Sequence, residues 1–275
     1  MIKDVVVNLP INAAQDAVTP YATSLAGAFG SQLTGIAFQY QPIIAPDIMG
    51  LTDARFAEQQ EAEAARKAEA ALQRLRNEIQ REQIPWTARA VDVSAEEAPG
   101  KFAEIARAFD LAIVGQEEPD RAGVENLIAE ATLFESGRPT LVIPYVQRKA
   151  FCADRVAVCW DGSRPASRAI NDMLPLLHRD SDIKLVTIQG ERALREELPG
   201  ADMAEHLARH GYKIELHNLT IGEDIASTIL NFVADRDIDL LVMGAYGHTR
   251  LREFILGGAT RGILESMTVP TLMSH

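Results

Sequence analysis

The chain alternates short apolar runs with longer segments whose apolar residues recur every three or four positions. Continuous apolar runs are typical of strands that are buried on both faces of a parallel sheet. In the second half this pattern predicts strands at Val156–Trp160, Ile183–Ile188, Lys213–Leu219, Leu240–Met243 and Thr271–Met273. Helices are predicted at Pro165–Leu177, Leu194–Arg209, Glu223–Arg236 and Thr260–Met267. Strands that alternate with helices indicate an α/β fold with a covered parallel sheet.

The same order of elements occurs twice along the chain. FDLAIVG, which ends at Gly115, corresponds to IDLLVMG, which ends at Gly244. KDVVVNLP matches DRVAVCWDGS at the start of each repeat, and SGRPTLVIP matches SMTVPTLMSH at its end. A tandem duplication of this kind sets the domain organisation. We therefore expect two doubly wound domains, at residues 1–148 and 152–275, each an open, mostly parallel five-stranded sheet with helices on both faces.

One predicted helix is much longer than the others. Residues Thr52–Gln83 are rich in Ala, Glu, Arg and Gln, which are strong helix formers. The alternating charges favour a solvated outer face with salt bridges, and a coiled-coil partner is the alternative interpretation. The preceding segment, Gln41–Gly50, holds two prolines and is interpreted as a loop or lid without a counterpart of similar length in the second repeat.

Charge and composition exclude several classes of protein. The 275 residues carry a formal charge of -12. The net charge is -7 for residues 1–150 and -5 for the remainder, so neither half offers a general nucleic-acid-binding surface. No run reaches the roughly 20 apolar residues of a membrane span. Cys152 and Cys159 make neither a CxxC pair nor a four-ligand zinc site of thiolates, and we expect a protein of the reducing cytoplasm.

Glycines gather in the second repeat behind its fourth predicted strand. Gly244 and Gly247 follow that strand, and Gly257 and Gly258 precede the last helix. Glycine lets a backbone approach a phosphate closely, and a helix N-terminus adds a favourable dipole. Asp161 follows the first strand and lies beside Gly244 if the strand order is doubly wound, where its carboxylate can accept from ribose hydroxyls. The alternative is that these glycines only form turns and helix caps.

The spacing Gly244-x2-Gly247-x9-Gly257 resembles the nucleotide motif G-x2-G-x9-G-[ST] of the universal stress protein family. The resemblance covers nearly the whole chain and implies a Rossmann-like, ATP-binding protein with a regulatory or stress-response role, with or without Mg²⁺. It implies that Asp161 contacts the nucleoside and that Ile188 packs on adenine. The residues implied to line the ribose and phosphates are Met243, Gly244, Gly247, Gly257, Gly258, Ala259 and Thr260. Gly258 departs from the motif, which has Ser or Thr there, and Thr260 offers a replacement hydroxyl.

The first repeat departs further from the motif. Gly115 matches the first glycine, but Glu118 stands at the second, and Ile128 and Ala129 stand at the last two. Asn8 is taken as the best match for Asp161. The acidic cluster of Glu117, Glu118 and Asp120 would repel a triphosphate. We expect this repeat not to bind ATP in the family manner and to pair with the second repeat through PTLVIP and PTLMSH; a homodimer stays open.

Other residues give weaker signals. His206 and His210 share a helix face at the spacing of a metal pair, although a solvated face is favoured. His248, Arg250, Arg252 and Arg261 flank the glycines, and Arg261 is the preferred phosphate ligand among the arginines. No hydrolase or P-loop motif is present, so no catalytic residue is assigned and slow ATP hydrolysis is the most we expect. A nucleotide-independent interaction module of the same fold is the alternative function.

Overall fold

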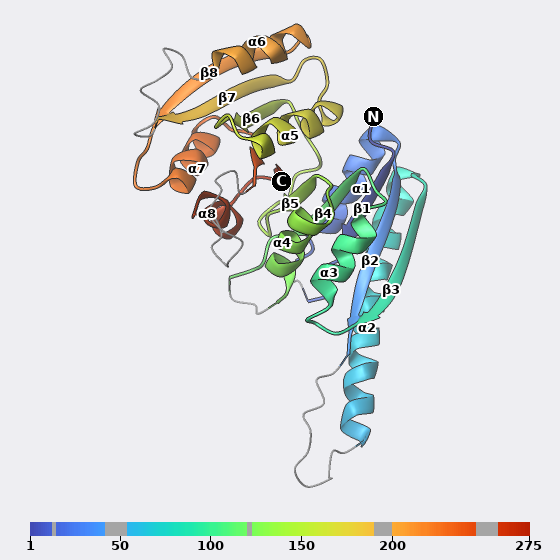
Figure 1. The fold of residues 1–275 in the computed structure, drawn as a ribbon. Helices are drawn as coiled ribbons and strands as arrows, with labels where there is room; N and C mark the ends of the chain where they lie inside the picture. The colour runs from blue at the N-terminus through green and yellow to red at the C-terminus, as the bar shows by residue number, and fades with distance from the viewer. Residues whose placement is uncertain (13–14, 42–53, 120–122, 190–199, 246–257) are drawn as a thin grey trace.

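A computed structural model describes the chain except for residues 13–14, 42–53, 120–122, 190–199 and 246–257. Within the described residues ten strands form a single sheet, in the order β3-β2-β1-β4-β5-β10-β9-β6-β7-β8 (Figure 1). Five neighbouring strands come from each repeat. The two halves expected from the sequence are therefore each a five-stranded doubly wound sheet, and they join into one continuous sheet.

The strands are short and mostly buried, as the apolar runs predict. The first repeat contributes β1 (Asp4–Asn8), β2 (Gln32–Tyr40), β3 (Trp86–Val93), β4 (Leu111–Gly115) and β5 (Thr140–Ile143). The second contributes β6 (Arg155–Cys159), β7 (Asp182–Gln189), β8 (Lys213–Thr220), β9 (Leu240–Gly244) and β10 (Thr271–Ser274). The bounds of β6 to β10 each lie within one or two residues of those predicted for the second half. All pairs within a repeat are parallel.

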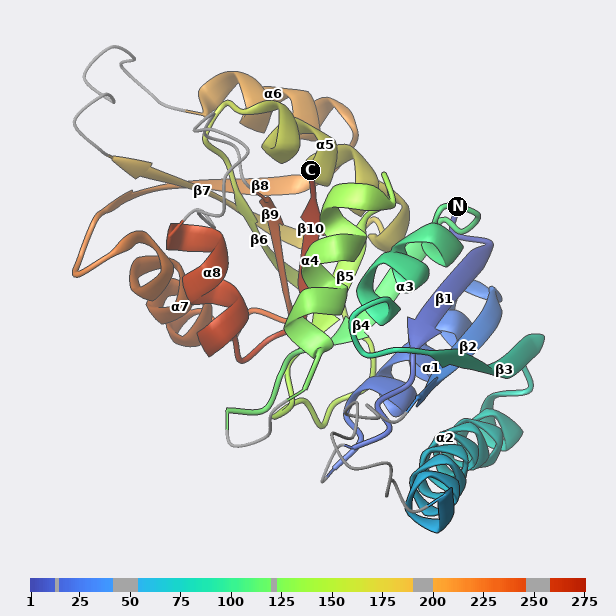
Figure 2. The same ribbon diagram turned by 60° about the horizontal axis from the view of Figure 1, so that its bottom comes forward.

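Helices cover both faces of this sheet and give it two apolar cores. One face carries α1 (Val18–Phe29), α2 (Ala54–Glu82), α5 (Arg164–Met173) and α6 (Ala201–Arg209). The other carries α3 (Ala98–Ala106), α4 (Glu125–Glu135), α7 (Ile225–Asp235) and α8 (Gly258–Ser266), which Figure 2 shows. Alternate strand residues enter the two cores, as in Val5 and Val6. This double burial explains why the strands are continuously apolar.

The last strands of the two repeats meet at the centre of the sheet. β5 and β10 pair antiparallel, with Thr271 opposite Val142 and Met273 opposite Thr140. Equivalent helices of the two repeats consequently lie on the same face. The side chain of Gln116 adds a second contact between the repeats, because its amide donates to the carbonyl oxygen of Leu264 over 2.9 Å.

Two helix boundaries of the second repeat differ from the sequence prediction by more than two residues. Helix α6 begins at Ala201, because Gly200 has a φ of 86° and stands outside helical geometry; residues 194–199 lie outside the described part of the chain. Helix α5 ends at Met173, and Leu174–Leu176 form a 3-10 turn (η1). Pro175 within that turn carries no N–H for an α-helical hydrogen bond.

Helix α2 has two distinct parts. Its C-terminal part packs on the sheet through buried Ala68, Ala71, Leu72, Leu75 and Ile79. Its N-terminal part projects beyond the sheet (Figure 1) and carries exposed ion pairs from Glu63 to Arg66 and Lys67. The solvated face expected from the charges is therefore present on this part, while the Gln41–Gly50 loop beyond Gln41 lies outside the described residues. Across the described residues, none of the helices combines the length and apolarity that a membrane crossing requires.

Candidate functional site

The second repeat has a topological switch point, at which the strand order reverses, between β6 and β9. β6 pairs with β7 on one side and with β9 on the other, all parallel. The chain leaves β6 toward β7 and β8 and then returns to β9 and β10, so the connections run in opposite directions. In open α/β sheets ligands bind at the carboxyl ends of the strands at such a point. The structure thus brings Asp161, just past β6, to the strand end next to Gly244.

Asp161 organises the turn that leads into α5. Its Oδ1 accepts from the backbone N–H of Ser163 over 2.9 Å, and Gly162 between them has a φ of 74°. Ser163 then caps the helix, because its Oγ accepts from the N–H of Ala166 over 3.2 Å. A cap of this kind fixes where the helix begins and how it is aimed. The exposed Asp161 side chain is therefore held by its own turn just past the carboxyl end of β6.

At Gly244 the backbone of α5 lies very close to the sheet. A Cβ added to Gly244 would lie 2.4 Å from the backbone nitrogen of Ala166 and 2.6 Å from the carbonyl carbon of Pro165. Backbone atoms at these distances leave no room for a side chain, so the fold alone requires glycine here. The same contact places the N-terminus of α5, which carries a partial positive charge, at the carboxyl end of β9.

The other predicted ligand residues have mixed surroundings. Ile188 is half-buried near the end of β7 and packs against the core that α7 and α8 cover, and Met243 is only 5% exposed. Gly258 is exposed and Ala259 is half-buried in the first turn of α8, whereas Thr260 is 3% exposed. Gly247 and Gly257 lie outside the described residues, as do His248, Arg250 and Arg252.

The arginine proposed to bind phosphate and the histidine pair are both associated with helices. Arg261 lies in the first half of α8, and its Nε donates to Glu265 over 2.7 Å, in an exposed i, i+4 ion pair. His206 and His210 lie on one face of α6 with their ring centroids 4.8 Å apart. The helix-face spacing of the two histidines is thus as predicted.

The first repeat has a cleft at the corresponding point. It lies where β1, β4 and β5 end and is lined by residues that include Asn8, Gly115, Glu118, Glu125 and Tyr145. Burial raises the pKa of the Glu125 carboxyl, and the charges of Glu117 and Glu118 raise it further. Negative charge therefore accumulates where a phosphate would have to lie; Asp120 is outside the described residues.

The match between Asp161 and Asn8 is wrong. In the sheet, Val5 faces Leu111 of β4 just as Val156 faces Leu240 of β9. Carrying that register forward places Pro10, not Asn8, at the position of Asp161. Proline has no side-chain oxygen, so the first repeat lacks this acceptor altogether. Ile128 and Ala129, at the last two motif positions, are fully buried inside α4 and face the core.

Comparison with known proteins identifies the second repeat. Residues 153–275 match the model of the universal stress protein family. This part of the chain is similar to the domains of that family. A universal stress protein of Synechocystis, Slr1230, is 28% identical over 169 residues, which are 60% of this chain and 57% of that protein. The chain therefore spans a little over half the length of this curated relative.

Solved structures extend the likeness to both repeats at the level of the fold. A universal stress protein from Archaeoglobus fulgidus superimposes with a TM-score of 0.66 at 16% identity, covering 98% of this chain and 95% of that one. A candidate universal stress protein from Pseudomonas aeruginosa gives a TM-score of 0.63 at 13% identity, covering 99% and 93%. Whole chains in this fold family thus share the tandem arrangement of the present one.

Proposed function

We propose that this protein is a nucleotide-binding regulator with two universal stress protein domains, residues 1–148 and 152–275, and that ATP binds in the second. Asp161 would hold the ribose, and Ile188 would pack on the adenine. The phosphates would lie against the glycines and the first turn of α8, with or without Mg²⁺. No catalytic residue is assigned, because the sequence contains no hydrolase or P-loop motif.

The observation that supports this proposal is the meeting of Asp161, Gly244 and the α5 N-terminus at adjoining strand ends. An acceptor carboxylate is present there, and Gly244 lets the N-terminus of α5 come close to the end of β9. The partial positive charge of a helix N-terminus favours an anion. These groups come together only through the β6–β9 pairing, which is the switch point of the sheet. The residues present therefore fit a nucleotide.

The first domain is assigned a structural and regulatory part. Pro10 supplies no acceptor, Ile128 and Ala129 are buried, and Glu118 and Glu125 line its cleft. Its β5 strand pairs with β10, and Gln116 reaches the carbonyl of Leu264 on α8, the helix that would receive the phosphates. A nucleotide-dependent movement of α8 would thus change a contact with the first domain directly.

Nucleotide content and affinity test the proposal. Acid extraction of the purified chain should release adenine nucleotide, and titration calorimetry should show saturable binding of ATP in the presence of Mg²⁺. Asp161→Asn keeps an oxygen that accepts from Ser163 but removes the charge, so we expect the affinity to fall about tenfold. Gly257→Val should abolish binding, because the motif needs close backbone approach there.

The matched control is Gly100→Val on α3 of the first domain. A Cβ at Gly100 meets no atom closer than 3.9 Å, so this glycine-to-valine change should leave ATP affinity unchanged. Equal affinity in the wild-type, Asp161→Asn and Gly257→Val proteins would contradict the site. The absence of a thermal shift with millimolar ATP and Mg²⁺ would instead support a nucleotide-independent interaction module.

A further inference from the structure

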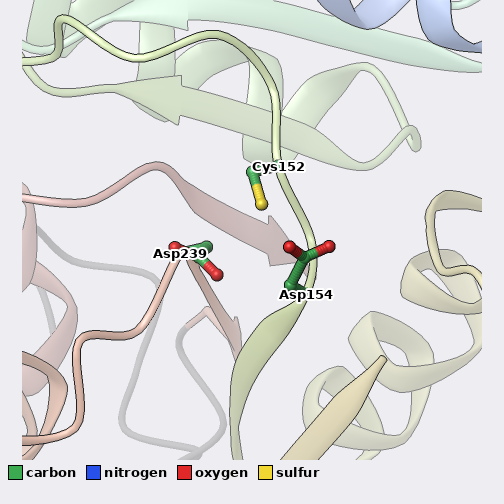
Figure 3. A group of neighbouring side chains, drawn as sticks. All are labelled: Cys152, Asp154 and Asp239. Carbon is green, nitrogen blue, oxygen red and sulfur yellow. The ribbon is translucent and has the colours of Figure 1, made fainter. Parts of the chain in front are cut away.

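A group of side chains that could bind a metal ion lies at the end of the strands opposite to Asp161 and Gly244. Cys152 and Asp154 precede β6, and Asp239 precedes β9. Their side chains converge (Figure 3), and one ligand atom from each lies within 4.8 Å of the other two. Since Cys152 belongs to the segment that joins the two repeats, this group lies at their junction.

Both carboxylates are oriented by neighbouring groups. Asp239 accepts from the backbone N–H of Arg155 over 3.0 Å and from its guanidinium over 3.2 and 3.3 Å. Asp154 Oδ1 lies 2.8 Å from Nε2 of His178. Outer contacts of this kind hold the ligands of metal centres in place.

An unsatisfied hydroxyl points to a missing ligand beside this group. Tyr21 on α1 is only 2% exposed, and within the described structure its hydroxyl has no hydrogen-bond partner. The Tyr21 ring packs edge-to-face against Phe151, the residue before Cys152, with 6.0 Å between the ring centroids. Buried hydroxyls nearly always have a partner. A water molecule held beside Cys152 and Asp239 would provide one.

The first repeat shows which part of this arrangement the fold needs. Asp110, the counterpart of Asp239, accepts from the backbone N–H groups of Lys3 and Asp4 over 2.7 and 3.1 Å. Both aspartates therefore fasten the start of a neighbouring strand. By the same register, Lys3 stands at the position of Asp154 and Met1 at that of Cys152. The thiol and the second carboxylate are thus additions that the fold does not require.

We propose that Cys152, Asp154 and Asp239 bind a divalent transition-metal ion of the Zn²⁺ class, with a water that hydrogen-bonds to Tyr21 as the fourth ligand. A thiolate with carboxylates suits Zn²⁺. Tetrahedral ligands at zinc bond lengths are about 3.3–3.8 Å apart, so ligand atoms that lie within 4.8 Å of one another have to approach by at most about 1.5 Å. The three negative charges of one thiolate and two carboxylates balance the two positive charges of the ion and the single charge of the Arg155 guanidinium. The ion ties the segment between the repeats to β9.

Metal content of the full-length chain tests this proposal. After removal of metals and dialysis against Zn²⁺, elemental analysis should give one Zn²⁺ per wild-type chain. Cys152→Ser should lose that ion, and Asp154→Asn, a change at an exposed side chain, should weaken binding about tenfold or more. Co²⁺ should give a thiolate-to-cobalt charge-transfer band in the wild-type protein and none in Cys152→Ser.

Two controls separate this site from other sources of zinc binding. Cys159→Ser removes the other thiol, and His206→Ala breaks the histidine pair on α6; both variants should keep the ion and the cobalt band. No zinc uptake by the wild-type chain would overturn the proposal, as would uptake by Cys152→Ser equal to that of the wild type. Loss of the ion in His206→Ala alone would assign it to the histidine pair instead. If Cys152→Ser fails to fold, Asp154→Asn and the cobalt spectrum decide.

Discussion

The two repeats share a backbone at their switch points but differ in the side chains that they present there. The N–H of Gln116 donates to the carbonyl of Ile143, and the N–H of Ala245 donates to that of Ser274, both over 2.8 Å. Around this common main chain, the first repeat has Pro10, Gln116 and a cleft lined by glutamates, whereas the second has Asp161 and Ala245 in place of Pro10 and Gln116. Similar folds therefore carry different chemistry at equivalent points, and the fold alone does not assign a ligand.

The largest expected difference concerns the two glycines that end the fourth strands. Gly244→Ala would place a Cβ 2.4 Å from backbone of α5, whereas Gly115→Ala would meet only the Val18 Cγ2 methyl at 3.0 Å. Backbone cannot yield as a side chain can, so we expect Gly244→Ala to lower the free energy of unfolding by about 3 kcal/mol and Gly115→Ala by about 1 kcal/mol. Urea denaturation measures both; equal losses would contradict the steric account of Gly244.

A smaller effect is expected for the contact that the first repeat makes with the second. Gln116→Ala removes the 2.9 Å hydrogen bond to the Leu264 carbonyl and leaves that carbonyl without this donor. We expect a loss of about 1–2 kcal/mol in the free energy of unfolding. Gln147→Ala, which removes an exposed bond to the carbonyl of Lys149, is the control and should cost less than about 0.5 kcal/mol. A similar loss in both variants would show that the contact between repeats adds little.

The helix cap beside Asp161 should have a moderate effect. Ser163→Ala removes the acceptor for the Ala166 N–H at the start of α5. Loss of an N-cap acceptor lowers the free energy of unfolding by about 1 kcal/mol. Thermal denaturation of Ser163→Ala beside Ser163→Thr, which keeps the hydroxyl, measures it. If both variants have the same melting temperature as the wild type, the turn at Asp161 does not depend on this cap.

The smallest expected effect is a pH dependence that comes from the first-repeat cleft. Burial, followed by the charges of Glu117 and Glu118, raises the pKa of Glu125 in the folded state. The unfolded chain therefore loses this proton first, and the contribution of Glu125 to stability falls as the pH rises from its ordinary pKa through the raised one. Glu125→Gln should be less sensitive to pH over that range and more stable than the wild type at pH 8. Urea denaturation at pH 4 and pH 8 compares the two proteins, and an unchanged pH slope would contradict the effect.

The sequence predicts the order of elements well because strand and helix periodicity are local properties. The apolar runs locate each strand of the second repeat, and the duplication gives the five-stranded halves. Contacts between distant residues leave no such local signal. Nothing periodic indicates that Gln116 reaches Leu264, that Ala166 requires glycine at 244, or that Tyr21 packs against Phe151. Only the register of β1 with β4, set beside that of β6 with β9, shows that Pro10 and not Asn8 corresponds to Asp161.

The residues of the nucleotide site stay a prediction, and Gly247 and Gly257 lie outside the described part of the chain. Topology alone places Asp161 next to Gly244, because both end adjacent parallel strands, and this much follows from the sequence. The steric requirement at Gly244 adds a second reason for a glycine that the motif attributes to ligand binding. Glycine at this one position therefore does not by itself distinguish binding from packing.

The most direct test of the central claim is photolabelling of the full-length chain with 8-azidoadenosine triphosphate, followed by peptide mapping. Labelled peptides should come from residues 153–275, and both excess ATP and the Asp161→Asn change should reduce the labelling. Label in the peptides that form the first-repeat cleft, around Asn8, Gly115 and Tyr145, would contradict the assignment of nucleotide binding to the second repeat. Labelling that excess ATP does not reduce would contradict specific nucleotide binding.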